Sequence, residues 1–146
     1  MLGCGAIGSS AATQLARSGA EKFSLYDFDK VSEANVGVSQ YNTPDVGKYK
    51  VDILEKYLKE ICSSPIIFPI KENQQYSFKK PTVKKYVKYW YDDQEGSEEP
   101  CTAKATSYCS NMAGSFITNS VAKIVTKQPH EQEIIFHFPS MVLTAR

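Results

Sequence analysis

The feature that most constrains this chain is a glycine pattern, G-x-G-x-x-G, over residues 3–8. In this spacing Gly3 permits a tight turn at the end of a strand, Gly5 lets the backbone approach a phosphate, and Gly8 lets the next helix pack closely on the sheet. Residues 9–18 favour a helix, whose N-terminus offers unpaired N–H groups to an anion. The pattern predicts a phosphate-binding turn, with a glycine-rich turn that binds no ligand as the alternative.

An acidic residue follows the next predicted strand, as nucleotide binding requires. Residues 23–26 indicate a strand, and Asp27 comes directly after it, near the separation of roughly 20 residues at which an acid meets a ribose hydroxyl. Only Met1 and Leu2 precede the glycine pattern, whereas a strand usually has about five residues. We therefore expect a βαβ nucleotide-binding unit that lacks most of one central strand.

Composition argues against several broad classes of protein. The 146 residues suggest one domain, and a net charge of +1 gives no general attraction to nucleic acid. No apolar run approaches the roughly 20 residues of a transmembrane helix, and no signal segment opens the chain, so we expect a cytoplasmic protein without a membrane partner. The four cysteines form no C-x-x-C pair, so neither a structural zinc site nor disulfides are expected. Cys4 is expected to be a small apolar filler.

Apolar periodicity predicts two elements in the first half of the chain. Val51, Leu54 and Leu58 recur at helical spacing within a predicted helix over residues 48–61. Residues 66–70 indicate a strand, and its prolines favour an edge position because proline cannot donate to a neighbouring strand.

The C-terminal part predicts a long helix over residues 102–126 and a hairpin of residues 133–138 and 141–144. Small residues Ala113 and Gly114 would allow close packing of the helix. The apolar residues expected on one face of it are Met112, Phe116, Val121 and Ile124.

Residues 71–100 form the least regular stretch, in which lysines alternate with aromatic residues before an acidic run. Such a mixture can bind single-stranded nucleic acid, or it can be a short segment docked by its aromatic side chains. The acidic run favours the second interpretation. The acidic residues themselves suggest a solvated loop, with a carboxylate metal site as the alternative.

Four segments together go beyond a general nucleotide fold, because they arrive in one order and at one spacing. This combination resembles the ThiF/MoeB/HesA family of ubiquitin-activating-enzyme-like adenylyltransferases over residues 1–70, and more loosely over residues 100–146. The segments are Gly3-Cys4-Gly5-Ala6-Ile7-Gly8-Ser9, Leu25-Tyr26-Asp27-Phe28-Asp29-Lys30-Val31, Glu33-Ala34-Asn35-Val36 and Asp45-Val46-Gly47-Lys48-Tyr49-Lys50-Val51.

The resemblance implies an α/β, Rossmann-like fold with a mostly parallel sheet and flanking helices, incomplete relative to the family. Residues 1–146 would form a single nucleotide-binding domain, made of a glycine-loop half (1–70), an irregular region (71–100), and a long helix with terminal strands (101–146). In this family ATP activates the C-terminal carboxylate of a small ubiquitin-like carrier protein, commonly one ending in Gly-Gly. Relatives are often homodimers.

The resemblance also assigns residues. Asn35 and Lys50 would reach the phosphates, and Lys50 would stabilise the negative charge that gathers when a carboxylate attacks the α-phosphate, a task that Mg²⁺ normally shares. The residues that would bind the nucleotide are Gly3, Gly5, Gly8, Asp27 at the ribose, Asp29 at the same strand end, Asn35 and Lys50.

The chain departs from the family pattern in two places. An arginine usually follows the asparagine in an Asn-x-x-Arg-Gln run, but residues 35–40 contain none. The metal-binding aspartate of a later D-x-x-D-N segment is not found between Ile70 and Cys101, so no metal ligand is assigned. Cys101 stands near a predicted helix start, where a thiol pKa is lowered. It could accept the activated carrier, or it could be a small packing residue.

Three functions stay open from the sequence. The leading one is an ATP-dependent adenylyltransferase of the ThiF type. The second is a ThiF-like module that binds a partner without catalysis. The third is an NAD-dependent oxidoreductase, in which Lys50 would have no role.

Overall fold

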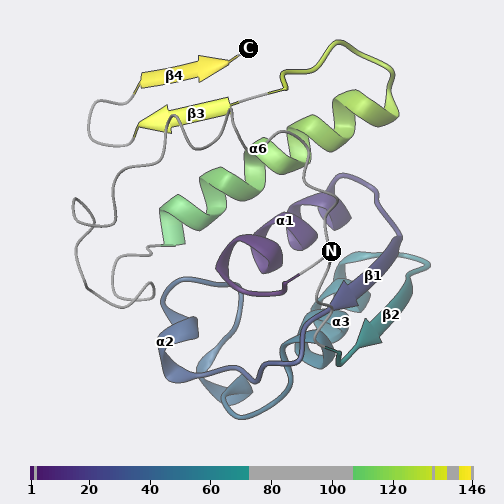
Figure 1. Ribbon diagram of the computed structural model, residues 1–146. Coiled ribbons are helices and arrows are strands. Elements are labelled where there is room, and N and C mark those ends of the chain that lie inside the picture. Colours follow the sequence, from purple (N-terminus) through teal and green to yellow (C-terminus); the bar gives the residue numbers. More distant parts are fainter. Residues whose placement is uncertain (2, 73–106, 133, 138–141, 146) are drawn as a thin grey trace.

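The computed structural model describes residues 1, 3–72, 107–132, 134–137 and 142–145. Helices α1 and α6 lie between an antiparallel hairpin and a parallel two-stranded sheet, with α3 beside that sheet (Figure 1). In chain order the elements are α1 (Ala6–Arg17), β1 (Lys22–Tyr26), α2 (Glu33–Val36), the 3₁₀ turn η1 (Thr43–Asp45), α3 (Lys50–Ile61), β2 (Ile66–Ile70), α6 (Ser107–Val125), β3 (Ile134–His137) and β4 (Val142–Ala145).

The parallel sheet is extended by the first residues of the chain. β1 pairs with β2 in a register that runs from Lys22 opposite Ile66 to Tyr26 opposite Ile70. On the other side of β1, the Tyr26 N–H donates to the Met1 carbonyl over 3.0 Å, and the Gly3 N–H donates to the Tyr26 carbonyl over 2.9 Å. This is the hydrogen-bonding pattern of a parallel ladder. Met1 and Gly3 therefore lie beside β1, on the side away from β2.

The core lies where α3 and α1 meet one face of the sheet. Three residues of α3 at helical spacing, Val51, Leu54 and Leu58, are fully buried, as their periodicity predicts. From β1, Phe23 and Leu25 point into the same cluster, in line with the alternation of a strand. Burying each large aliphatic side chain contributes about 1.5–3 kcal/mol. This cluster holds the carboxyl end of β1 against the start of α3.

The helix α6 packs against α1, although the two are far apart in the sequence (Figure 1). The side chains at their interface include small and polar ones. Gly114 is buried against α1, and a Cβ built on it would lie 2.6 Å from the Ser10 Oγ. The expectation of an apolar face on α6 is wrong for Val121 and Ile124, which are exposed. Helices that approach this closely leave room at the contact only for small side chains, so the apolar residues lie elsewhere.

The predicted terminal hairpin is confirmed. β3 and β4 pair antiparallel, from Ile134 opposite Ala145 to His137 opposite Val142. The hairpin reaches α6 through Phe136, whose ring centroid lies 6.1 Å from that of Phe116. The sequence therefore located both strands to within about two residues.

Two helices begin at residues other than those expected. α1 begins at Ala6 rather than at residue 9, because the third glycine of the pattern lies inside the first helical turn. α3 begins at Lys50 rather than at residue 48, because Gly47 has a positive φ of 86° and Tyr49 pairs with Lys30 in a β-bridge. None of the helices in the described residues is long and apolar enough to cross a membrane.

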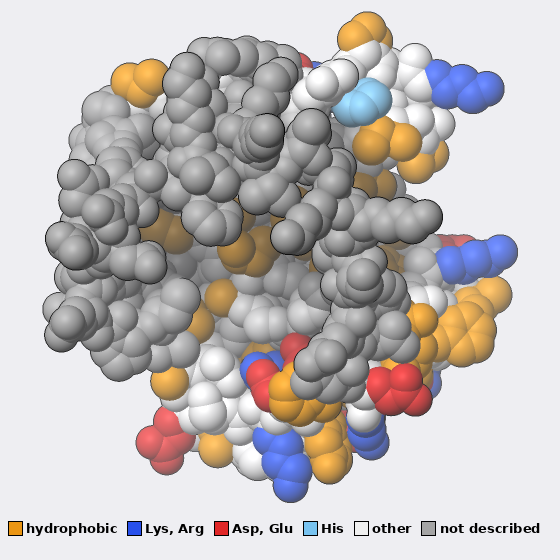
Figure 2. Space-filling view, in the orientation of Figure 1, with side chains coloured by type: hydrophobic (Ala, Val, Ile, Leu, Met, Phe, Trp, Pro, Cys, Tyr) orange, Lys and Arg blue, Asp and Glu red, His pale blue; other side chains and the backbone are white. Residues whose placement is uncertain are grey.

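The described surface carries charges of both signs. On the face shown in Figure 2, Lys and Arg side chains lie interspersed with Asp and Glu side chains over its lower part. This mixture agrees with the net charge of +1.

We predict that Gly114→Ala destabilises the α1–α6 contact. The new methyl group would lie 3.0 Å from the Ala11 backbone nitrogen as well as against Ser10, so the helices must move apart. We expect a net loss of about 1–2 kcal/mol in a urea unfolding experiment, even though alanine favours a helix over glycine by about 1 kcal/mol. Gly37→Ala is the matched control. Its methyl group would meet nothing within 4 Å, and an equal loss there would contradict the prediction.

Candidate nucleotide-binding site

The glycine pattern forms the turn that leads from the sheet into α1. Gly3 has a φ of 78°, in the left-handed region that favours glycine. A Cβ built on Gly8 would lie 1.9 Å from the Gly3 carbonyl oxygen, so only glycine fits there. Gly5 is the N-cap of α1, and a Cβ on it would meet nothing within 4 Å. Gly3 and Gly8 therefore shape the turn, and Gly5 borders open space.

The N-terminus of α1 carries no neutralising group of its own. The N-cap Gly5 makes no side-chain cap hydrogen bond, and the first turn holds no acidic residue. The first N–H groups of a helix have no partner within the helix, and they carry a partial positive charge. This end of α1 is therefore suited to an anion.

The buried carboxylate of Asp27 joins the glycine turn to the end of β1. Its Oδ2 accepts the Cys4 N–H over 2.6 Å, and its Oδ1 accepts the Asp29 N–H over 2.8 Å. A buried carboxylate requires such donors, because desolvation of an unpaired charge is costly. Each carboxylate oxygen can accept more than one hydrogen bond, so Asp27 keeps the capacity to bind a hydroxyl.

Lys50 and Asp29 form a close ion pair beside this turn. The Lys50 Nζ lies 2.9 Å from the Asp29 Oδ2, and the Lys50 N–H donates to the Asp29 carbonyl over 3.0 Å. The lysine side chain is only 9% exposed, whereas that of the aspartate is 49% exposed. Lys50 is the first residue of α3, where the helix dipole disfavours a cation. Asp29 offsets that cost and holds the ammonium in place.

The structure gives Asn35 a local hydrogen bond. Its side-chain oxygen accepts the Ser32 N–H over 2.9 Å, within a capping box at the start of α2. A contact of Asn35 with phosphate stays a prediction. Cys101 lies outside the described residues, so its role also stays a prediction.

The described residues do not by themselves suit Mg²⁺. They contain no group of three or more His, Cys, Asp or Glu residues that could hold a metal ion. The two carboxylates at the site are engaged, Asp27 by backbone N–H groups and Asp29 by Lys50. Most of the stretch from Ile70 to Cys101, where the family carries its metal-binding aspartate, lies outside the described residues.

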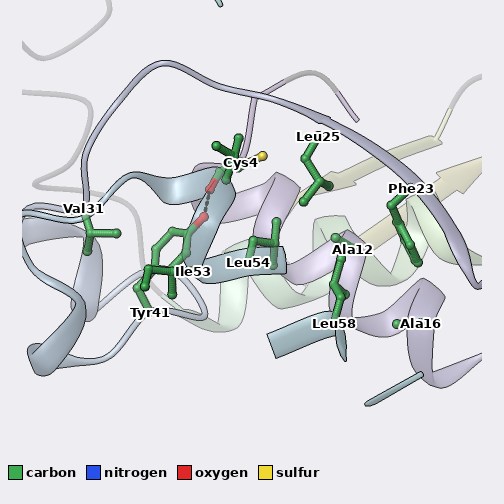
Figure 3. Packing of buried hydrophobic residues seen from close by; sticks show 11 residues of the cluster. Cys4, Ala12, Ala16, Phe23, Leu25, Val31, Tyr41, Ile53, Leu54 and Leu58 are labelled. Carbon is green, nitrogen blue, oxygen red and sulfur yellow. Dashed lines mark hydrogen bonds between the residues drawn. The ribbon is translucent and has the colours of Figure 1, made fainter. Parts of the chain in front are cut away.

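Sequence reasoning missed Tyr41, which lies beneath the glycine turn. It is 2% exposed, and its hydroxyl donates to the Cys4 carbonyl over 2.5 Å, with the Lys50 carbonyl 3.4 Å away (Figure 3). Burial, together with the nearby Cys4 and Asp27, raises the pKa of this hydroxyl above its usual range, so it stays a donor. The only sequence signal is a single aromatic residue in a loop rich in Gly, Asn and Pro.

These contacts form a chain of hydrogen bonds along the site. The chain runs from Cys4 through Asp27 and Asp29 to Lys50, and the Tyr41 hydroxyl donates to the Cys4 carbonyl from the other side. It brings together three predicted site residues and ties them to the glycine turn. The uncapped helix, the open space at Gly5 and the Lys50 ammonium fit a nucleotide phosphate.

A comparison with models of protein families shows which family this chain belongs to. The model of the ThiF family matches residues 1–89, more than half of the chain. The chain belongs to the ThiF family. A search among curated protein sequences found no match.

Solved structures support the fold of this ThiF-family chain. E. coli MccB with succinimide superposes with a TM-score of 0.76 at 16% identity, covering 99% of this chain and 62% of that one. E. coli MccB with ATP gives 0.76 at 17% identity, covering 99% and 61%. PaaA gives 0.74 at 16% identity, covering 99% and 62%. The predicted Rossmann-like α/β fold is confirmed, and the chain spans less than two thirds of the length of these relatives.

We predict that Gly8→Ala prevents the glycine turn from closing. A methyl group 1.9 Å from a backbone oxygen cannot be relieved by a side-chain rotation, so we expect a loss of about 3 kcal/mol or more in urea unfolding. Gly5→Ala adds the same atoms at the N-cap in open space, and we expect a cost of about 1 kcal/mol or less. Equal losses in the two variants would contradict this assignment.

We also predict that the Cys4 thiol is unreactive in the folded protein. Burial, reinforced by the nearby Asp27, raises its pKa to about 12, so at pH 8 only about one thiol in ten thousand is a thiolate. Iodoacetamide at pH 8, followed by peptide mass spectrometry, should leave Cys4 unlabelled in buffer and label it in urea. Rapid labelling of Cys4 in buffer would show that the glycine turn is open in solution.

Proposed function

We propose that this chain binds ATP over the glycine turn and transfers the adenylyl group to the C-terminal carboxylate of a small carrier protein or peptide. The observation that carries the proposal is the chain of hydrogen bonds that links Lys50 to the glycine turn through Asp29 and Asp27. A structural ion pair alone does not require an uncapped helix and a glycine turn beside it. Lys50, the uncapped start of α1 and the glycine turn together favour a polyanion.

Adenylyl transfer needs positive charge beside the α-phosphate. A carboxylate oxygen of the carrier forms a bond to the α-phosphorus, the bond from that phosphorus to the bridging oxygen breaks, and pyrophosphate leaves. Negative charge gathers on the phosphate oxygens as this happens. The Lys50 ammonium and the N–H groups of α1 are preorganised donors that stabilise such charge. To reach a phosphate, Lys50 exchanges the carboxylate of the half-exposed Asp29 for a phosphate oxygen.

The relatives support a nucleotide and a second substrate. MccB has been solved with ATP and, separately, with N-formylated MccA. For this chain we propose ATP as the nucleotide, and a ubiquitin-like carrier with a C-terminal Gly-Gly as one class of second substrate. Four further points stay predictions. They are Cys101 as the acceptor of the carrier, a homodimer, a part for Mg²⁺ in stabilising the phosphate charge, and a cytoplasmic location.

We predict that Lys50→Ala weakens ATP binding by about 10- to 100-fold. This range corresponds to the loss of one hydrogen bond to a charged group, about 1.5–3 kcal/mol. The measurement is calorimetric titration of ATP with Mg²⁺ present, with circular dichroism to confirm folding. Lys59→Ala is the matched control, because Lys59 lies on the same helix and pairs with Glu55 at the surface. Unchanged ATP affinity in Lys50→Ala would show that the phosphate site is misassigned.

Parallel titration of NAD separates the three functions. ATP binding without NAD binding supports the adenylyltransferase, and pyrophosphate exchange with candidate carriers then tests the transfer. NAD binding alone would replace the proposal with an oxidoreductase. Carrier binding in the absence of any nucleotide binding would replace it with a non-catalytic module.

A further inference from the structure

The Tyr41 hydroxyl holds one peptide group of the glycine turn from below. Tyr41 lies in the loop between α2 and η1, and its side chain belongs to the buried cluster. Figure 3 shows the hydroxyl directed at the Cys4 carbonyl, at a distance of 2.5 Å. The Cys4 N–H is held separately by Asp27. Both peptide groups that flank the Cys4 α-carbon are therefore fixed by buried side chains.

The position of the Cys4 carbonyl decides where the next N–H points. No cis peptide bond is found in the described residues, and in a planar trans peptide the C=O and the N–H point in opposite directions. Because the Cys4 carbonyl points into the core at Tyr41, the Gly5 N–H points away from the core. The same residue borders open space, since a Cβ on it would meet nothing within 4 Å.

Gly5 could not hold this orientation by itself. Glycine occupies positive and negative φ with similar ease, so the Cys4–Gly5 peptide can rotate at little cost if its carbonyl is released. The hydroxyl opposes this rotation, because a rotated carbonyl would leave the buried Tyr41 hydroxyl without its acceptor, at a cost of about 1–3 kcal/mol. The Lys50 carbonyl also lies 3.4 Å from this hydroxyl, but the hydroxyl proton is donated to Cys4 at the shorter distance.

We propose that Tyr41 is a positioning residue for phosphate recognition, whose hydroxyl fixes the Cys4–Gly5 peptide so that the Gly5 N–H faces a bound phosphate group. The proposal rests on the proposed function insofar as the site takes a nucleotide. It adds a residue that touches neither the nucleotide nor the carrier. It also explains why a polar hydroxyl is buried beneath a turn that ordinary packing could fill with phenylalanine.

The test is Tyr41→Phe, which removes the hydroxyl and keeps the ring. Calorimetry should show about tenfold weaker binding of ATP and of inorganic tripolyphosphate, with adenosine affinity unchanged. Tyr57→Phe is the matched control, because that hydroxyl donates to the Asp45 carboxylate rather than to the glycine turn. It should lower stability without altering tripolyphosphate affinity. A merely structural role for Tyr41 would weaken adenosine and tripolyphosphate alike.

Nuclear magnetic resonance supplies a second measurement that does not depend on the variant folding. Saturating tripolyphosphate should shift the Gly5 amide proton of the wild-type chain, and an unshifted Gly5 amide would overturn the proposal. Equal tripolyphosphate affinity in Tyr41→Phe and wild type would overturn it as well. If tripolyphosphate binds in the Tyr41-dependent manner but no carrier supports pyrophosphate exchange, adenylyl transfer fails as the function and the role of Tyr41 stands.

Discussion

The structure of the site depends on a carboxylate that is buried at the end of a strand. Asp27 is held by two backbone N–H groups, one from the glycine turn and one from Asp29. Because a buried carboxylate without donors is strongly disfavoured, the glycine turn and the chain after β1 must both come to it. That requirement fixes where α1 begins relative to the sheet. It also places Asp29 where its carbonyl and carboxylate can hold Lys50.

The charges of Lys50 and Asp29 neutralise each other at this site. Lys50 is nearly buried at the start of a helix, a position that disfavours a cation, and Asp29 compensates from a half-exposed position. An anionic ligand can therefore replace Asp29 as the partner of Lys50, while the released carboxylate is solvated. The helix α1 contributes an uncapped N-terminus to the same arrangement. Binding would then replace the Asp29 carboxylate with the ligand anion as the partner of Lys50. No buried charge would be left without a partner.

Much of this fold could be predicted, because its elements carry local signals. The helical spacing of Val51, Leu54 and Leu58 predicts α3, and the pattern near the C-terminus predicts the hairpin. The sequence predicts close packing at Gly114, but it does not show that α1 is the partner, because the buried residues of α6 are small or polar and make no apolar stripe. There the Ser10 hydroxyl donates to the Asn111 side-chain oxygen over 2.8 Å. Whether such groups are buried depends on which helix covers them, and no window of sequence contains that information.

The sequence by itself determined the glycine turn, the acid after β1, the lysine at the start of α3 and the ThiF family to which they point. Each of these follows from residue types at fixed local spacing. The tertiary structure decided how they are connected: that Asp29 neutralises Lys50, that Asn35 caps its own helix, and that Tyr41 supports the Cys4 carbonyl. Each is a choice among competing hydrogen-bond partners, and for Lys50 and Tyr41 the partner is distant in the chain. They are made only when packing brings the segments together and water no longer competes.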